Sequence, residues 1–144
     1  MELSFMKTKF LLLTILLFSS HFAHSQQKIT GKWINKDNDA QIEIFQKESK
    51  FFGKIVWLKE PNQPNGKPKI DLKNENENLR KRPIIGLIIL SDLTFSNGKW
   101  INGSMYSPKN GISVACTASL LNENELKLTL SKSVFRTTKI WKRI

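Results

Sequence analysis

The side chains most able to bind or react gather in one short stretch of the chain, residues 71–86. Its polar residues include Asp71, Asn74, Arg80 and Arg82. An acid beside two arginines could hold a carboxylate or a phosphate through paired N–H donors. Polar residues on a loop that a rigid scaffold holds in place are also typical of binding sites. The alternative is structural: Asp71 caps a short helix, and the arginines pair with Glu75 and Glu77 on its surface.

Three aromatic residues in apolar stretches, Trp57, Trp100 and Tyr106, could face the interior of the domain and contact a ligand there. Ligand pockets combine apolar walls with a few polar groups, which indole and phenol side chains both supply. The alternative is that they pack the core, because small domains need bulky aromatic side chains inside.

The residues needed for most catalytic chemistry are missing from the main part of the chain. Both histidines, His21 and His24, lie near the amino terminus in a segment that resembles an export signal. Without them, Ser-His-Asp and Cys-His catalysis and histidine-ligated metal sites are excluded. The single Cys116 alternates with apolar residues and is predicted to be buried. We therefore expect no catalytic residue, no metal and no cofactor; a histidine-free hydrolase using carboxylates such as Asp71 and Glu75 is the distant alternative.

Residues 1–25 have the features of a signal peptide. A basic start precedes an apolar run over residues 10–18, and a small-x-small cleavage site follows at residues 23–25. The apolar run is too short to span a bilayer comfortably. The sequence thus predicts a single domain over residues 26–144 that is exported to the periplasm or the medium and does not span the membrane.

The rest of the chain has the pattern of short β-strands. Alternating or continuous apolar runs are bounded by turn residues, which predicts strands at 28–34, 40–46, 51–58, 84–95, 100–106, 112–120, 126–130 and 134–142. The longest interruption is residues 59–69, which hold three prolines, followed by one or two predicted helical turns over residues 71–82. Eight strands joined mostly by hairpins favour an antiparallel up-and-down barrel, since closure removes exposed edges; an open sandwich is the alternative.

Several motifs, in this order, resemble the bacterial family of unknown function DUF2147, whose exported members are similar to lipocalins and other calycin-type barrels. The matching pieces are Gly31-Lys32-Trp33, Phe52–Leu58, Asp71 with Asn74, Arg82–Leu87, Trp100–Gly103, Tyr106-Ser107-Pro108 with Gly111, Arg136-Thr137, and Trp141-Lys142-Arg143. The resemblance implies a fold and an exported location but no established activity. The chain departs from the pattern at Phe135, where the family usually has glycine, and after Leu130, where a glycine-rich lead-in is missing.

Gly31-x-Trp33 is similar to the lipocalin signature, in which the tryptophan closes one end of the barrel and an arginine lies across its ring. Arg136 or Arg143 could supply that arginine. The resemblance implies structural roles for Gly31, Trp33, Arg136, Trp141 and Arg143.

The net charge of +11 indicates which partners the protein prefers. For an exported protein it favours anionic lipids, polysaccharides or acidic small molecules over nucleic acid, although scattered lysines can simply form a solvated surface. We expect a non-enzymatic, lipocalin-like protein that binds a small apolar or amphipathic, anionic ligand at a mouth bordered by residues 59–86. The alternative is a filled barrel that binds an anionic envelope surface through its basic face. An interior cavity above roughly 300 Å³ would favour the first function, and a filled interior would favour the second.

Overall fold

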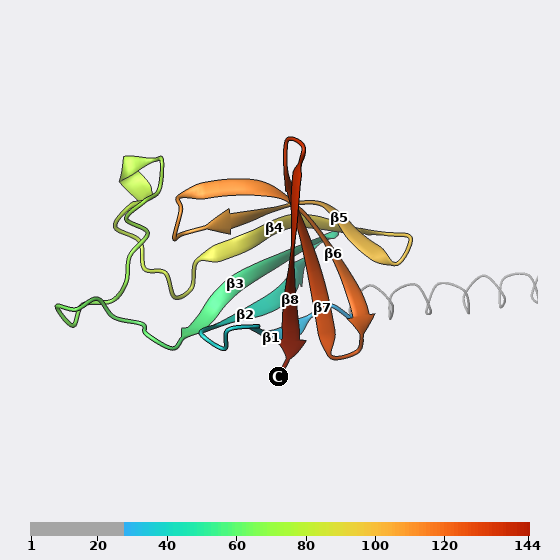
Figure 1. Ribbon diagram of the computed structural model, residues 1–144, viewed down its shortest axis with the longest axis horizontal. Helices are drawn as coiled ribbons and strands as arrows, with labels where there is room; N and C mark the ends of the chain where they lie inside the picture. The colour runs from blue at the N-terminus through green and yellow to red at the C-terminus, as the bar shows by residue number, and fades with distance from the viewer. Residues whose placement is uncertain (1–27) are drawn as a thin grey trace, which may run out of the picture.

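The computed structural model describes residues 28–144; the predicted signal peptide, residues 1–25, lies outside the described part. Eight antiparallel strands form a closed barrel in which each strand pairs with the next and the last pairs with the first (Figure 1). The strands are β1 (Gly31–Asn35), β2 (Ala40–Lys47), β3 (Lys50–Leu58), β4 (Ile88–Ser96), β5 (Lys99–Ser107), β6 (Ile112–Asn122), β7 (Glu125–Lys132) and β8 (Phe135–Arg143). This arrangement confirms the predicted up-and-down barrel and excludes the open sandwich.

Short turns place the strands in register. The β4–β5 turn uses Asn97 and Gly98, both with positive φ, as the Asn-Gly pair predicts. Because the strands alternate in direction, the β1–β2, β5–β6 and β7–β8 turns all lie at one end of the barrel, together with the β3–β4 connection. We call this end the mouth and the opposite end the base.

Closure of the barrel is short. β8 pairs with β1 only at Trp141–Arg143, where Trp33 lies opposite Arg143 and Asn35 opposite Trp141. The first half of β8 therefore has β7 as its one neighbour among the named strands. Residues Phe135–Lys139 are all exposed, and the β7–β8 hairpin projects from the barrel wall at the top of Figure 1.

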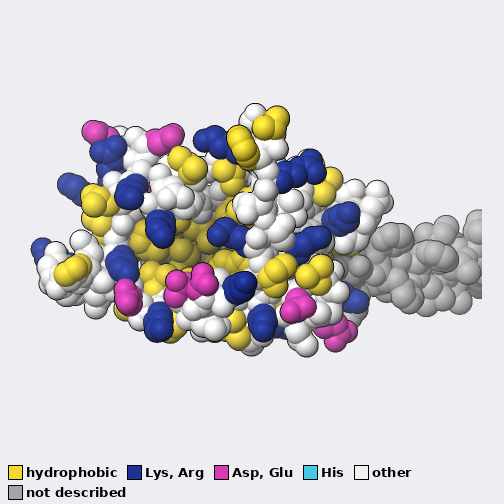
Figure 2. All heavy atoms as spheres, viewed as in Figure 1, with side chains coloured by type: hydrophobic (Ala, Val, Ile, Leu, Met, Phe, Trp, Pro, Cys, Tyr) yellow, Lys and Arg dark blue, Asp and Glu magenta, His cyan; other side chains and the backbone are white. Residues whose placement is uncertain are grey.

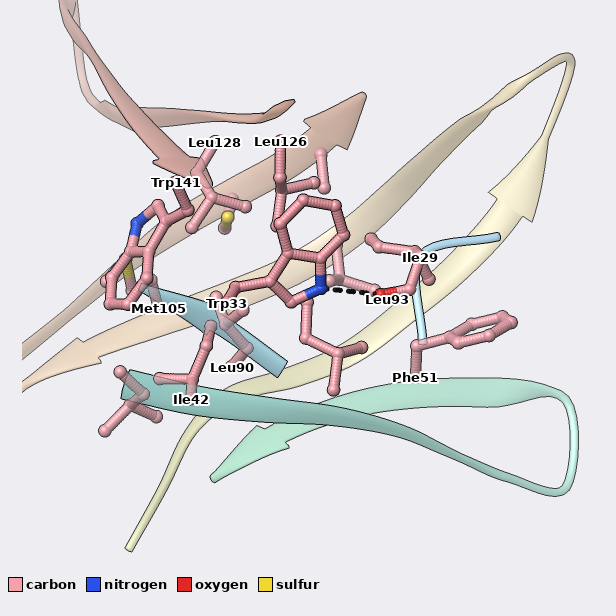
Figure 3. Packing of buried hydrophobic residues seen from close by; sticks show 14 of the residues in the cluster. Ile29, Trp33, Ile42, Phe51, Leu90, Leu93, Met105, Leu126, Leu128 and Trp141 are labelled. Carbon is pink, nitrogen blue, oxygen red and sulfur yellow. Dashed lines mark hydrogen bonds between the residues drawn. The ribbon is translucent and has the colours of Figure 1, made fainter. Parts of the chain in front are cut away.

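Large apolar side chains fill the interior of the barrel. Trp33, Phe51, Trp100 and Trp141 are buried together with apolar residues from strands β2 to β7 and with Ile29, Ile84 and Leu87. The ring of Trp33 sits at the centre of this packing, and its Nε1 donates to the carbonyl of Ile29 at 2.9 Å (Figure 3). The interior is therefore filled, which is the arrangement expected for the surface-binding alternative. One cavity lies at the mouth of the barrel and another on its outer face.

β-Bulges change which side chains point inward. Gln41 of β2 lies opposite Trp57 of β3, but the next residue, Ile42, lies opposite Ile55, so Val56 is one extra residue on β3. This bulge turns Trp57 outward and Leu58 inward. Trp57 is consequently 39% exposed. The prediction that Trp57 could face the interior is therefore not met.

A second bulge acts on β5. Trp100 pairs with Ala118 and Gly103 pairs with Cys116, with Asn102 in the left-handed region at φ 60°. Trp100 and Met105 thus point into the core, and Tyr106, next to Met105, lies on the outer face. Of the three aromatic candidates, only Trp100 lies in the interior.

The β3–β4 connection, residues 59–87, is mostly irregular and folds back on itself. Its internal bridges join Asn62 to Pro68 and Ile70 to Pro83. The predicted helix over residues 71–82 is wrong in extent: a single 3-10 turn at Glu77–Leu79 forms, with Asn76 rather than Asp71 as its N-cap. The next strand begins at Ile88, four residues later than predicted, because residues 84–87 belong to this returning segment.

Candidate functional site

Asp71 is the centre of the polar cluster in the β3–β4 connection. Its side chain is fully buried. Oδ1 accepts a hydrogen bond from the Tyr106 hydroxyl at 2.6 Å, and Oδ2 accepts from Asn74 Nδ2 at 2.8 Å. The guanidinium of Arg82 donates to the same Oδ2 from Nε at 2.9 Å and from Nη2 at 2.8 Å. Both carboxylate oxygens are therefore already engaged within the protein.

The electrostatics of the cluster keep Asp71 ionised. Burial alone raises the pKa of a carboxyl group, but hydrogen bonds from Tyr106, Asn74 and Arg82, together with the positive charge of Arg82, bring the pKa of Asp71 below its ordinary value. On the phenol the balance is the opposite: burial and the neighbouring Asp71 carboxylate raise the pKa of Tyr106 more than Asn74 and Arg82 lower it. Neither group is placed in the pKa range of a general base at neutral pH.

The cluster ties the connection to the barrel wall. Tyr106 belongs to β5, 35 residues from Asp71 in the chain. The neighbouring Gly111, with φ +75°, lies so close to the carbonyl of Lys73 that a Cβ there would collide with it. The second arginine stays within the connection, since Arg80 donates to the carbonyl of Asn74 at 2.7 Å and to Glu77 at 2.9 Å. The four predicted polar residues thus lie close together: Asp71, Asn74, Arg80 and Arg82. With Tyr106 they hold the β3–β4 connection against the barrel wall, and we call this group the clamp.

A polar cavity of about 440 Å³ lies beside this clamp. Arg82 and Tyr106 border it on one side, and Ser91 and Ser104, joined through their hydroxyls at 2.9 Å, border it on the outer face of β4 and β5. Lys132 from the end of β7 and the acidic Glu75 also line it. Hydroxyl groups and two cations could accept a small anion, but the Arg82 edge that faces Asp71 is already used.

A larger cavity of about 730 Å³ lies at the mouth of the barrel. The inward-facing ends of β2 and β3 contribute to it, the connection forms one wall, and the β1–β2 and β5–β6 turns close the rim. Its apolar lining consists of Ala40, Ile55, Leu58, Ile70, Leu72, Ile84 and Pro108. Figure 2 shows apolar surface in a hollow of this face, bordered by charged side chains.

Charged groups surround the apolar lining of the mouth cavity. Lys59, Lys69 and Lys109 supply positive charge, and Asp37, Asp39 and Glu60 supply negative charge. Lys69 pairs with Glu60 at 3.6 Å. Within residues 28–144, Lys59 and Lys109 form no ion pair, so their ammonium groups can meet a ligand. Sequence reasoning missed the lining of this cavity; the apolar residues scattered through a proline-rich connection were the signal that could have found it.

The predicted tryptophan and arginine pair closes the base. Arg143, rather than Arg136, lies across the Trp33 ring, with its guanidinium carbon 4.1 Å from the ring centre. Its Nη1 donates to the carbonyl of Thr30 at 2.9 Å and its Nε to that of Glu123 at 2.8 Å. Gly31, at φ +119°, leaves room for the Arg143 guanidinium, which a Cβ would approach to 3.0 Å. Arg136 is exposed on the projecting half of β8.

The remaining candidates lie inside the barrel. Trp100 packs edge-on against Phe51, with ring centres 6.3 Å apart. The Nε1 atoms of Trp100 and Trp141 are buried and have no hydrogen-bond partner among the described residues. Cys116 is buried, and burial raises the pKa of its thiol to about 12. In the described part of the chain, no three His, Cys, Asp or Glu side chains gather in a way that could hold a metal ion.

Comparison with known proteins agrees with this architecture. The model of the family described as "Uncharacterized protein conserved in bacteria (DUF2147)" matches residues 31–143. Among solved structures, the chain is similar to protein HP1028 from Helicobacter pylori, described as belonging to the lipocalin family, with a TM-score of 0.70 and 22% identity. The match covers 81% of this chain and 82% of that one. A search of curated proteins found no match. Across residues 28–144, no helix has the length and apolar character needed to cross a membrane.

Proposed function

The chain belongs to the DUF2147 family, and we propose that it is an exported, non-enzymatic protein that binds a small amphipathic, anionic ligand at the mouth of its barrel. The observation that carries the proposal is the mouth cavity of about 730 Å³. Its volume lies within the range of about 300–1,000 Å³ that small-molecule sites occupy. The lipocalin-like fold supports a binding role.

The lining of the mouth cavity determines the kind of ligand. Ile55 and Leu58 lie at its barrel side, and Ile70, Leu72 and Ile84 form the wall contributed by the connection. An apolar ligand body can displace water from these side chains, at about 25 cal/mol for each Å² buried. Because the core below is packed, we expect the ligand to lie across the mouth rather than deep inside the barrel.

The charged rim favours a ligand with a negative head group. Lys59 and Lys109 lack acidic partners within the described residues, and the chain as a whole carries +11. Asp37 and Asp39 on the β1–β2 turn work against an anion on that side of the rim. We therefore place the head group toward the lysines, on the side of the β5–β6 turn.

Titration calorimetry with dodecanoate tests the proposal, with dodecyltrimethylammonium as a cationic probe of equal chain length. We expect dodecanoate to bind with one-to-one stoichiometry and more tightly than the cation. Leu72→Ser should weaken binding about tenfold, because it removes part of the apolar wall, and Lys109→Gln about twofold to fivefold.

Two substitutions at the base serve as controls for this experiment. Leu121 is an exposed leucine, as Leu72 is, and Lys99 is an exposed lysine. Leu121→Ser and Lys99→Gln should leave dodecanoate binding unchanged. If neither probe binds, or if Leu72→Ser binds as wild type does, the mouth cavity is not the ligand site; tighter binding of the cation would reject the anionic head group.

Export is the second part of the proposal. Its support is the basic start, the apolar run and the small-x-small site of residues 1–25. Mass spectrometry of the protein from fractionated cells should find a mature chain that begins at Gln26 in the periplasm or the medium. An intact chain in the cytoplasmic fraction would reject export.

A further inference from the structure

The tip of the β7–β8 hairpin carries the most exposed apolar side chains of the described residues. Val134 is 86% exposed and Phe135 is 77% exposed. They follow Ser133, which has φ +55°, in a two-residue turn between the paired residues Lys132 and Phe135. A soluble surface normally shows single apolar residues rather than two large adjacent ones at the end of a projection.

Positive charge surrounds this apolar tip. Lys132, Arg136 and Lys139 lie on the projecting part of the hairpin, and residues 131–139 include no acidic side chain. Figure 2 shows apolar surface at the top of the view with lysine and arginine side chains on both sides. On β3, by contrast, both lysines are paired with acids: Lys50 with Asp92 and Lys54 with Glu43.

We infer that the β7–β8 hairpin tip inserts into the interface of an anionic phospholipid bilayer. Val134 and Phe135 would enter the boundary between head groups and acyl chains, and the three cations would meet lipid phosphates. Amphipathic segments bind membranes through this combination of apolar burial and attraction to anionic lipids. Each cation near an anionic membrane surface strengthens binding about fivefold.

The geometry limits how far the hairpin can enter. β8 pairs with β1 only from Trp141 onward. Along residues 136–140, the edge of β8 that faces away from β7 has no strand partner, so its backbone N–H and C=O groups need water. Such unpaired backbone groups do not enter hydrocarbon. Insertion is therefore confined to the turn.

The size of the tip argues against a protein partner. A stable protein interface buries about 800 Å² on each side, whereas the apolar surface at the tip comes from two side chains. The cations around it also repel a second copy of the same hairpin. An anionic bilayer complements both the apolar tip and its charge without a large matching surface.

Vesicle sedimentation tests this inference with a chain that begins at Gln26, because the apolar run of residues 10–18 would bind vesicles by itself. This chain contains every strand of the closed barrel. We expect it to bind vesicles of equal parts phosphatidylglycerol and phosphatidylcholine, and to bind pure phosphatidylcholine at least tenfold more weakly. The double substitution Val134→Ser and Phe135→Ser should weaken binding to the anionic vesicles about tenfold or more. Leu121→Ser, which removes an exposed leucine at the base, should bind as wild type does.

A dye at the tip tests insertion directly. A Val134→Cys variant can be labelled there with an environment-sensitive fluorophore, because the native Cys116 is buried with a raised thiol pKa. Its emission should shift to the blue on anionic vesicles, whereas a dye on a Leu121→Cys variant should not respond. This measurement uses folded, labelled protein, so it remains informative if the double serine variant fails to fold.

Several results would overturn the inference. These are absence of wild-type binding to anionic vesicles, unchanged binding by the double serine variant, and a tip dye that stays in water. A wild-type dimer that the serine substitutions dissociate would assign the tip to self-association instead. Leu72→Ser should bind vesicles normally, so membrane docking and ligand binding at the mouth can fail independently.

Discussion

Replacing Asp71 with asparagine tests whether the buried cluster is a structural clamp. The side chain keeps its shape but loses its charge, and one acceptor oxygen becomes a donor. Asp71 now accepts from Tyr106, Asn74 and Arg82. The new amide cannot accept from all of these donors, so at least one hydrogen bond is lost or replaced by a clash between donors.

The expected cost follows from burial on each side of the ion pair. Breaking a fully buried pair costs about 3–5 kcal/mol, and a hydrogen bond to a charged group is worth about 1.5–3 kcal/mol. Asp71 is fully buried, but 36% of the Arg82 side chain is exposed, so water can replace part of its lost interaction. We therefore expect Asp71→Asn to lower the free energy of unfolding by about 2–4 kcal/mol at pH 7, which lowers the melting temperature by about 10 °C.

The effect should depend on pH in a defined direction. The folded-state pKa of Asp71 lies below its unfolded value. The ionised carboxylate therefore adds stability above the unfolded pKa of about 3.9, and this contribution is lost as the pH falls through the folded pKa. The difference in stability between wild type and Asp71→Asn should be full at pH 7 and should shrink as the pH falls below the unfolded pKa of about 3.9.

Urea unfolding followed by tryptophan fluorescence between pH 7 and pH 2.5 measures this difference. Asp92→Asn is the matched control, since Asp92 pairs with Lys50 at 2.7 Å with both side chains about half exposed. Asparagine also tolerates the positive φ of 60° at Asp92. The control should cost less than about 1 kcal/mol. A midpoint for Asp71→Asn equal to that of wild type, or a difference that persists unchanged at pH 2.5, would refute the clamp.

Three further predictions concern the contacts that fix the barrel and its connection. Gly111→Ala should lower the free energy of unfolding in urea by about 2–4 kcal/mol, because backbone strain at positive φ adds to a clash with the connection. Gly98→Ala is the control, since its φ is nearly the same but a Cβ there meets no other atom, and it should cost about 1 kcal/mol. Equal costs would contradict close packing at Gly111. Trp33→Ala should lower stability by about 3–5 kcal/mol and Arg143→Ala by about 1–3 kcal/mol in thermal melting, and an unchanged melting temperature for Trp33→Ala would reject its structural role. Cys116, with a thiol pKa of about 12, should not react with iodoacetamide at pH 8 while the protein is folded; rapid labelling of native protein would show that the thiol is accessible.

The strands could be predicted from the sequence because local patterns specify them. Alternation over residues 112–120 identifies the inward face of β6, where Cys116 and Ala118 are buried. Asn97-Gly98 identifies a hairpin through backbone preference alone. Where a strand bulges, the same reasoning fails, because one extra residue moves every later side chain to the other face. That is why Trp57 and Tyr106 lie outside the interior.

The geometry of the site could be predicted only in part. The sequence correctly brought Asp71, Asn74 and Arg82 together, because they are near neighbours in the chain. It could not show that the hydroxyl of Tyr106, 35 residues away, would donate to the carboxylate that was expected to cap a helix. With its carboxylate engaged by β5, Asp71 cannot cap a helix, and the 3-10 turn begins only after Asn76. A tertiary contact therefore overrode local helix signals that are weak in an asparagine-rich segment.

The clamp and the mouth cavity are two sides of one segment. Asp71 points to the barrel wall and Tyr106, while its neighbours Ile70 and Leu72 line the mouth. Ile70 bridges to Pro83, and the Leu72 amide donates to the Ile70 carbonyl at 2.9 Å, so the chain makes a tight turn centred on Asp71. A buried ionic contact can thus hold an irregular connection firmly enough to serve as a wall. The polar residues that first suggested a ligand site thus fix the position of the apolar residues that line the mouth cavity.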